Sequence, residues 1–335
     1  MPNRRSVLAQ IVGATAVGAS VQAVAASLGD QLTGDLAPVH DPCIIRQGAT
    51  YHLFCTSQAG QKPGLIHWRT SPDLVAWTLV GAVMPALPAW APQAVPGARG
   101  AWAPDISLIN GRYHLYYALS TFGKNRSAIA LQTTATLDRS DPAFGWRDEG
   151  VVLASRPDDD FNAIDPNIVA TTDGRVWMSF GSFWSGLKLV EIDPATGKPR
   201  LGAALAAIAA RSRPGAIEAP CIIERDGWFY LFASFDFCCR GADSTYYTVV
   251  GRSRAVAGPY VDRDGKPMMK GGGLIVLHAD LDPARRFKGP GHVAVLRDGD
   301  RDDIVYHAYD ARRGGVPTLR IQPLAWTDDG WPMAR

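Results

Sequence analysis

Residues 102–117 read WAPDISLINGRYHLYY, and this stretch decides the fold. A proline beside a carboxylate opens an apolar run, Asn110-Gly111 follows, and a run rich in tyrosine comes next. Asn-Gly between two apolar runs is a strong signal of a tight β-hairpin, because both residues tolerate the positive φ of its turn. The stretch therefore predicts two antiparallel strands joined at residues 110–111.

The same pattern recurs along the chain. Close copies are HDPCIIRQGATYHLF at 40–54, IDPNIVATTDGRVWMSF at 164–180 and EAPCIIERDGWFYLF at 218–232, and a looser one runs from GPGH at 289–292 to IVYHA at 304–308. The aligned prolines are 62, 62, 54 and 70 residues apart. Each interval has room for four strands and their loops, somewhat above the usual blade period of about 40–50 residues. The repeat predicts an all-β protein, a five-bladed β-propeller.

A two-sheet sandwich is the alternative fold, but it gives no reason to repeat one pattern at the same point of each unit. Further strands are expected at 127–132 and 187–192. Amphipathic helices are scarce, and residues 203–210 are the best short candidate for one.

The repeat also predicts where polar side chains meet. In a propeller the first strand of each blade lines the central channel. The pattern should therefore bring five side chains toward one mouth of the channel: Asp41, Asp105, Asp165, Glu218 and His292. Carboxylates gathered in a concave, poorly solvated site acquire different pKa values.

Composition excludes some functions. The chain has 335 residues, 47% of them hydrophobic and 20% charged, which is ordinary for a globular protein. Its formal net charge is only +2, so nothing supports nucleic-acid binding, which needs a basic face.

The first residues differ from the rest. Arg4 and Arg5 precede an uncharged run of mainly small residues that closes on Ala23-Val24-Ala25-Ala26. This pattern is typical of a twin-arginine export signal spanning residues 1–26, followed by one propeller domain at 27–335. A membrane anchor or a buried helix is the alternative, but the run is poor in Leu, Ile and Phe. We expect a protein exported to the bacterial periplasm or the medium, without stable membrane association once the leader is cleaved.

The five cysteines form no zinc-binding pattern, and their odd number means that at least one is unpaired or pairs between chains. The adjacent Cys238 and Cys239 are interpreted as small residues packed in a strand or turn rather than as a redox or metal site.

Several longer phrases resemble glycoside hydrolase family 43, and most closely its endo-1,5-α-L-arabinanases. The resemblance covers roughly residues 38–332. It is carried by STFG at 120–123, FNAIDPN at 161–167, FGSFWSG at 180–186, SFDFCCRG at 234–241, GGG at 271–273 and GPGH at 289–292. The resemblance implies a five-bladed propeller that hydrolyses internal linkages of arabinan and arabino-oligosaccharides, with inversion of the anomeric configuration.

The resemblance also implies three catalytic carboxylates. Asp41 would be the general base, Glu218 the general acid, and Asp165 would raise the pKa of Glu218 through like-charge repulsion and orient it. An inverting pair stands about 6.5–9.5 Å apart, so that water fits beside the sugar. A single Asp or Glu beside proline is usually a turn residue. Asp105 is not catalytic in the family, and we interpret it as structural.

By the same resemblance His292 would bind a divalent metal, usually calcium, in the channel, although calcium prefers oxygen ligands. A satisfied core histidine is the alternative. The resemblance implies that Asp41 and Asp165 also contact the sugar. It implies sugar contacts for seven further residues: Trp102, Phe122, Gly123, Asn162, Ser182, Phe183 and Trp184. Each aromatic residue could instead pack within a blade, and for Phe183 packing is expected as much as contact.

Three other functions remain open. An exo-acting β-xylosidase or α-L-arabinofuranosidase of the same family would share fold and carboxylates. A retaining fructan hydrolase would place its nucleophile in a phrase that is absent here. A non-catalytic sugar-binding propeller would be expected to lack one of the three carboxylates, and none is missing. The preferred arabinan branching, the product length, the identity of the metal, the oligomeric state and the cysteine pairing do not follow from the sequence.

Overall fold

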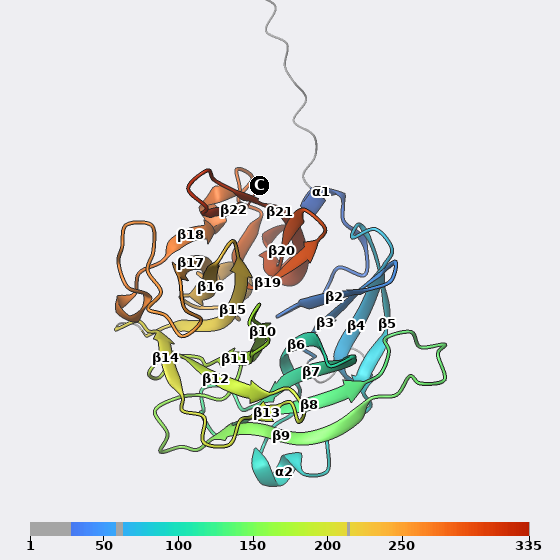
Figure 1. The fold of residues 1–335 in the computed structure, drawn as a ribbon. Coiled ribbons are helices and arrows are strands. Elements are labelled where there is room, and N and C mark those ends of the chain that lie inside the picture. Colours follow the sequence, from blue (N-terminus) through green and yellow to red (C-terminus); the bar gives the residue numbers. More distant parts are fainter. Residues whose placement is uncertain (1–27, 58–62, 213–214, 335) are drawn as a thin grey trace, which may run out of the picture.

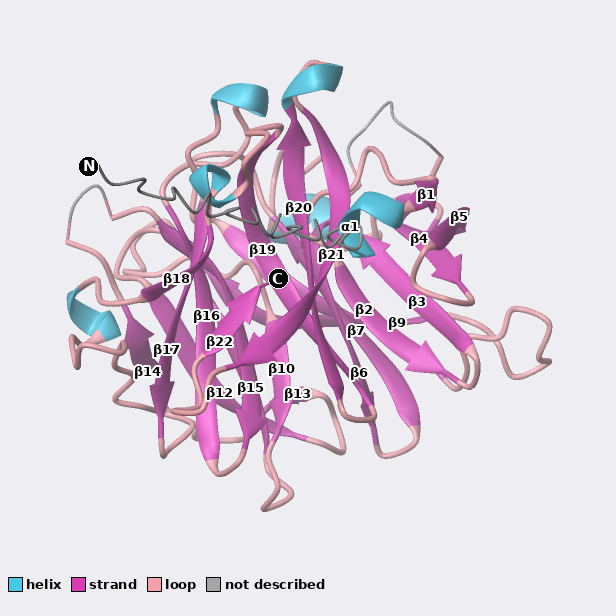
Figure 2. Cartoon of the chain, turned by 90° about the horizontal axis from the view of Figure 1, so that it is seen from above, coloured by secondary structure: helices cyan, strands magenta, loops and turns pink. Residues whose placement is uncertain are grey.

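The computed structural model describes residues 28–57, 63–212 and 215–334. The expected leader at 1–26 lies outside these residues. The described chain forms five separate sheets arranged as blades around a central axis, so the predicted five-bladed propeller is confirmed (Figure 1). Its strands run steeply between the two faces of the ring and helices are few and short (Figure 2). No helix in the described ranges is long and apolar enough to cross a membrane.

Each blade is a run of antiparallel hairpins taken almost in chain order. Blade 1 comprises β1 (Thr33–Gly34), β2 (Cys43–Gln47), β3 (Thr50–Cys55), β4 (Leu65–Ser71) and β5 (Ala76–Met84). Blade 2 comprises β6 (Trp102–Ile109), β7 (Arg112–Leu119), β8 (Ser127–Thr134) and β9 (Arg147–Ser155). Blade 3 comprises β10 (Asn167–Ala170), β11 (Val176–Phe180), β12 (Leu187–Asp193), β13 (Lys198–Pro199) and β14 (Ala206–Ala209).

Blade 4 comprises β15 (Ile217–Arg225), β16 (Trp228–Phe235), β17 (Tyr247–Ser253) and β18 (Leu274–Leu277). Blade 5 comprises β19 (Phe287–Asp298), β20 (Arg301–Asp310), β21 (Val316–Trp326) and β22 (Pro332–Ala334). The α-helices are α1 (Leu28–Gln31) and α2 (Ala91–Ala94), and the 3-10 helices are η1 (Gly241–Asp243), η2 (Met268–Lys270), η3 (Ala279–Leu281) and η4 (Ala311–Arg313).

The predicted hairpins form, with the expected two-residue turns at 110–111 and 226–227, a turn at 48–49 instead of 47–48, and a longer loop at 171–175. Ile109 pairs with Arg112, so Asn110 and Gly111 alone make the turn, with φ of 49° and 74°. Both angles are positive, as a two-residue turn of type I′ requires. The strands expected at 127–132 and 187–192 are β8 and β12. The helix expected at 203–210 is wrong, because residues 206–209 form strand β14, which pairs with β12.

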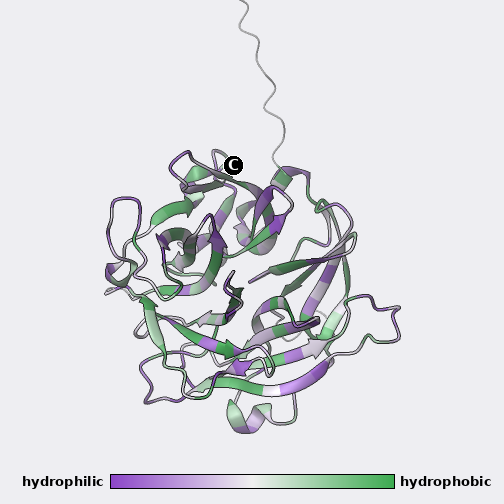
Figure 3. Ribbon diagram, viewed as in Figure 1, coloured by the Kyte–Doolittle hydropathy of each residue, from purple (hydrophilic) through white to green (hydrophobic). Residues whose placement is uncertain are grey.

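The core consists of five apolar clusters, each filling one interface between neighbouring blades. Hydrophobic positions accordingly gather in the strands and hydrophilic ones in the outer loops (Figure 3). The cluster between blades 5 and 1 closes the ring, with Leu53 and Trp77 on one side and Val305 and Ile321 on the other.

Backbone hydrogen bonds reinforce the closure between blades 5 and 1. The Val39 N–H donates to the carbonyl of Pro317 at 2.9 Å, and the Leu319 N–H donates to the carbonyl of Leu36 at 2.9 Å. This contact places residues 36–39 beside β21, so the strand that follows them, β2, begins at the channel.

Candidate active site

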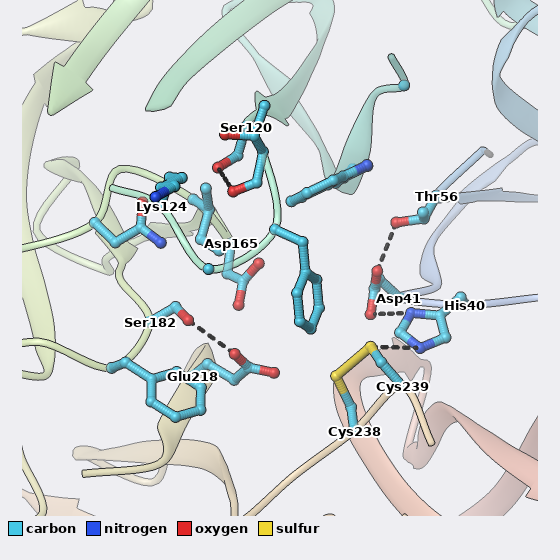
Figure 4. A pocket seen from close by; sticks show the side chains of 18 of the residues that line it. His40, Asp41, Thr56, Ser120, Lys124, Asp165, Ser182, Glu218, Cys238 and Cys239 are labelled. Carbon is cyan, nitrogen blue, oxygen red and sulfur yellow. Dashed lines mark hydrogen bonds and ion pairs between the residues drawn. A yellow bond between two sulfur atoms is a disulfide. The ribbon is translucent and has the colours of Figure 1, made fainter. Parts of the chain in front are cut away.

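A cleft of about 1160 Å³ opens at one mouth of the channel, and residues from all five blades line it. It is slightly larger than the roughly 300–1,000 Å³ of a pocket for a drug-sized ligand. All the residues predicted to act on or contact a substrate line it, together with His292: Asp41, Trp102, Phe122, Gly123, Asn162, Asp165, Ser182, Phe183, Trp184 and Glu218. Figure 4 shows Asp165 and Glu218 together, with Asp41 across the cleft from them.

A repeated bend of the backbone aims these side chains. The residue before the aligned proline has positive φ in every blade: 52° at Asp41, 46° at Ala103, 57° at Asp165, 53° at Ala219 and 55° at Gly289. Such a conformation costs on the order of 1–3 kcal/mol for a residue other than glycine and recurs at functional sites. It coincides with register shifts at the start of β6, β15 and β19. The bend lies just before β2 and β10 and within the first residues of β6, β15 and β19, and it turns the chain toward the channel.

Asp41 is a buried carboxylate with hydrogen-bonding partners on both oxygens. Thr56 donates to Oδ2 at 2.5 Å, while His40 Nδ1 and His292 Nδ1 lie 2.7 Å and 3.1 Å from Oδ1. Burial alone would raise the pKa of Asp41, but His40 and His292 outweigh it and hold this pKa well below its ordinary value. Asp41 is therefore ionised and able to accept a proton.

Glu218 lies on the other side of the cleft in a different environment. Ser182 donates to its Oε2 at 2.8 Å and Tyr246 donates to its Oε1 at 2.8 Å. Burial raises the pKa of Glu218 despite these two donors. A partly buried carboxyl group with a raised pKa suits a general acid, so Asp41 and Glu218 have opposite pKa shifts within one cleft.

Asp165 is tied to the backbone beside Glu218. Its Oδ2 accepts the N–H of Ala219 at 3.0 Å, which fixes the residue next to the acid. Burial raises the pKa of Asp165, and the charge of Glu218 raises it further. The two carboxyl groups therefore titrate as a pair. Repulsion from Asp165 was expected to raise the pKa of Glu218, whereas burial is the largest cause of its raised pKa.

Asp105 does not line the cleft, contrary to the expectation that its side chain reaches the same mouth of the channel as the other four. It follows its proline, whereas Asp41 and Asp165 precede theirs, and its carboxylate turns toward blade 3. Its Oδ2 accepts the Ile168 N–H at 2.8 Å and its Oδ1 accepts from Asn167 at 3.2 Å. Burial raises the pKa of Asp105 to about 7. These hydrogen bonds join blades 2 and 3, which agrees with the interpretation of Asp105 as a structural residue.

His292 projects into the cleft from β19 and pairs with Asp41. Burial lowers its pKa, but Asp41 and the other carboxylates outweigh this effect and raise it to about 9. Since Nδ1 faces Asp41, Nε2 is the nitrogen left for a metal. A metal held by His292 would use this one nitrogen and would lie near the ionised carboxylate of Asp41, whose negative charge favours a cation.

Two other groups of potential ligand atoms lie close together among the described residues: His40 with Cys238 and Cys239, and His40 with Asp41 and His307. Their atoms already have partners. Cys238 and Cys239 form a disulfide. The Asp41 N–H donates to His307 Nδ1 at 3.1 Å, and His40 Nδ1 faces Asp41.

The disulfide corrects the interpretation of Cys238 and Cys239 as packed small residues. The two sulfurs bond to each other and line the cleft, as Figure 4 shows. The other three cysteines, Cys43, Cys55 and Cys221, are free and buried.

The residues expected to contact sugar differ in how far they are free to do so. Phe122 and Trp184 are 81% and 43% exposed and can stack on a ligand. Phe183 is partly buried and its ring centroid lies 6.0 Å from that of Phe237, so it also packs. Ser182 is committed to Glu218. Asn162 uses Oδ1 to accept from Ser127 at 2.7 Å.

Four side chains in contact with the catalytic carboxyl groups were missed: His40, Thr56, Tyr246 and His307. Tyr309, which contacts His40, was missed as well. Two signals in the sequence could have found three of these side chains. His40 stands beside Asp41 in the repeated pattern, and residues 307 and 309 are two apart on β20 and therefore lie on one face of it. Tyr246 precedes β17 and lies in no repeated phrase. Only its contact with Glu218 reveals it.

Comparison with known proteins agrees with this geometry. Residues 37–332 match the family "Glycosyl hydrolases family 43". An extracellular endo-α-(1→5)-L-arabinanase of Bacillus subtilis (strain 168) is 40% identical over 296 residues, 88% of this chain and 87% of the relative. An extracellular exo-α-(1→5)-L-arabinofuranosidase of Cellvibrio japonicus (strain Ueda107) is 40% identical over 306 residues, 88% and 85% of the two chains. The solved endo-arabinanase of Bacillus licheniformis superposes with a TM-score of 0.82 at 44% identity, covering 90% and 99%.

Proposed function

The chain belongs to glycosyl hydrolase family 43, and from this membership and its cleft we propose that it is an endo-acting arabinanase that hydrolyses α-1,5-linked L-arabinan. The observation that carries the proposal is the pairing of Asp41, whose pKa is lowered, with Glu218, whose pKa is raised, across one cleft. The size of the cleft supports a polymeric substrate, because it offers room beyond a single pentose.

In the proposed mechanism water attacks the anomeric carbon while Asp41 takes one of its protons. Glu218 gives its proton to the departing glycosidic oxygen, so the bond breaks without an alkoxide leaving. Asp165 orients Glu218 through the Ala219 N–H, and the two carboxyl groups titrate as a pair. Attack from the face opposite the leaving group inverts the configuration, so α-linked chains give β-arabinose ends.

The proposed metal would bind to His292 through Nε2, with water as its remaining ligands. When bound, it would supply positive charge that favours the ionised form of nearby carboxyl groups. The proton transfers assigned to Asp41 and Glu218 do not pass through it.

We also propose export, on the evidence of the Arg4-Arg5 leader and of relatives that are extracellular. N-terminal sequencing of the secreted protein should find a first residue near Ala26 or Ser27. A mature protein that still begins at Met1 would contradict this.

The function is tested by product analysis on linear α-1,5-arabinan, with xylan and aryl pentosides as comparison substrates. An endo enzyme shortens the chains rapidly before small sugars accumulate, whereas release of short products from chain ends alone would favour the exo activity of the Cellvibrio relative. Proton NMR of the first product should show the β anomer. Retention of the α anomer would require Asp41 to be a covalent nucleophile about 5–5.5 Å from the acid.

A further inference from the structure

The catalytic base has a support that the function proposed above does not include. His40 stands between Asp41 and two groups from other blades: Tyr309 on β20 and the disulfide turn at Cys238–Cys239, which precedes η1. His40 Nδ1 lies 2.7 Å from Asp41 Oδ1, and its Nε2 lies 2.7 Å from the Tyr309 hydroxyl. Both ring nitrogens are thus used.

These contacts form a chain with one direction. A backbone N–H can only donate, and the Cys239 N–H donates to the Tyr309 oxygen at 2.7 Å. At the other end the Asp41 carboxylate accepts, as the proposed role of general base requires, so the proton between Asp41 and His40 is on His40 Nδ1. In the tautomer with its proton on Nδ1, His40 accepts the Tyr309 O–H at Nε2. Every donor in the series Cys239, Tyr309, His40 and Asp41 meets an acceptor.

The ring plane of His40 is fixed as well. It stacks on His307 with centroids 3.8 Å apart and an angle of 25° between the planes. His307 Nδ1 in turn accepts the N–H of Asp41 at 3.1 Å. His307 therefore contacts both the backbone of Asp41 and the His40 ring that holds the Asp41 side chain. Tyr309 is 2% exposed, so bulk water cannot replace His40 as its hydrogen-bond partner.

From this geometry we infer that His40 is a positioning residue, which holds the Asp41 carboxylate toward the attacking water and is itself held in one tautomer by Tyr309 and the disulfide turn. The inference rests on the proposed function, because it assigns His40 a role through the general base. His40 does not touch the reacting atoms in this role.

Asparagine and glutamine distinguish this role from packing. The amide nitrogen of Asn occupies the place of the His Nδ1 atom, whereas that of Gln occupies the place of Nε2. His40→Asn can therefore still donate to Asp41, and His40→Gln cannot. We expect His40→Gln to lower kcat on linear arabinan about 10- to 100-fold, the effect of one hydrogen bond to a charged group. KM should stay within about threefold, and His40→Asn should keep at least about tenfold more of kcat than His40→Gln.

Tyr309→Phe completes a double-mutant cycle. In wild-type protein it should lower kcat several-fold, because His40 loses the partner that fixes its tautomer. In the His40→Asn background it should change kcat less than about twofold, since Asn has no counterpart of Nε2. Thermal unfolding of each variant checks that the fold is kept.

The outcomes separate the two proposals. If wild-type protein does not cleave linear arabinan, the proposed function is wrong. If it does, equal kcat values for His40→Asn and His40→Gln overturn the positioning role alone. An equal effect of Tyr309→Phe in both backgrounds would likewise refute the inference, because Tyr309 would then act without His40.

Discussion

Replacing Tyr246 by Phe should move the alkaline limb of activity upward by about one pH unit. The Tyr246 hydroxyl donates to Glu218 Oε1 at 2.8 Å, and Phe removes this donor while keeping the buried ring beside His307. A hydrogen bond to a charged acceptor contributes about 1.5–3 kcal/mol. The protonated carboxyl group can still accept part of it, so the ionised form loses about 1.4 kcal/mol relative to the protonated one, which is one pKa unit. Because Glu218 acts only when protonated, activity then persists to higher pH.

The assay is kcat/KM on linear arabinan against pH, whose limbs report the groups of the free enzyme. Ser182→Ala removes the donor to the other oxygen of Glu218 and should shift the limb in the same direction. The matched control is Tyr247→Phe, since the neighbouring Tyr247 packs against Phe235 and His278 instead. An alkaline limb that stays in place or moves down in Tyr246→Phe would show that this hydroxyl does not stabilise ionised Glu218, or that Glu218 does not set the limb.

Three other perturbations test the remaining assignments. Asp165→Asn should move the alkaline limb downward. Asn can still accept the Ala219 N–H, but it removes one of the two carboxyl groups that titrate as a pair, and with it the like-charge repulsion that raises the pKa values of the pair. An upward shift in the same pH profile would contradict this. Asp41→Ala should lower kcat about 10²- to 10⁴-fold on every substrate. Glu218→Ala should lower kcat as much on arabinan but much less on an aryl arabinofuranoside that the cleft accepts, because the aryl leaving group needs little protonation. Equal losses of kcat on the two substrates would mean that Glu218 is not the acid. Removing metal with a chelator should lower kcat without changing the unfolding temperature by more than a few degrees. His292→Ala should remove any recovery of kcat on adding calcium. Full turnover in metal-free protein would rule out a catalytic ion.

The fold could be predicted because its information is local and repeated. Each copy of the pattern contains its own turn residues, and Asn110-Gly111 or Asp226-Gly227 fix a two-residue hairpin without help from the rest of the chain. Five such hairpins at similar spacing leave few arrangements open. The error at 203–210 has the same origin, since a run of alanines favours a helix locally and only the partner strand β12 makes residues 206–209 a strand.

The environment of the carboxylates could be predicted only in part, because it is assembled from separate blades. Tyr246 reaches Glu218 from the segment before β17, and Tyr309 reaches His40 from β20, 269 residues further along the chain. No spacing in the sequence records such contacts. The disulfide shows the same limit: Cys238 and Cys239 are adjacent in any fold, and their bond depends on the backbone turn that carries them.

One repeated backbone bend yields several chemical roles because the side chain varies around it. In blades 1 and 3 the bent residue is itself a carboxylate, so Asp41 and Asp165 enter the cleft directly. In blade 4 the acid comes one residue earlier, and the bend at Ala219 presents an N–H to Asp165 instead. Blade 2 places its carboxylate after the proline, and Asp105 therefore joins blades rather than facing the substrate. A position one residue away along the same pattern is thus enough to separate a catalytic side chain from a structural one, which is why the repeat predicts the cleft but each role requires the contacts of its own residue.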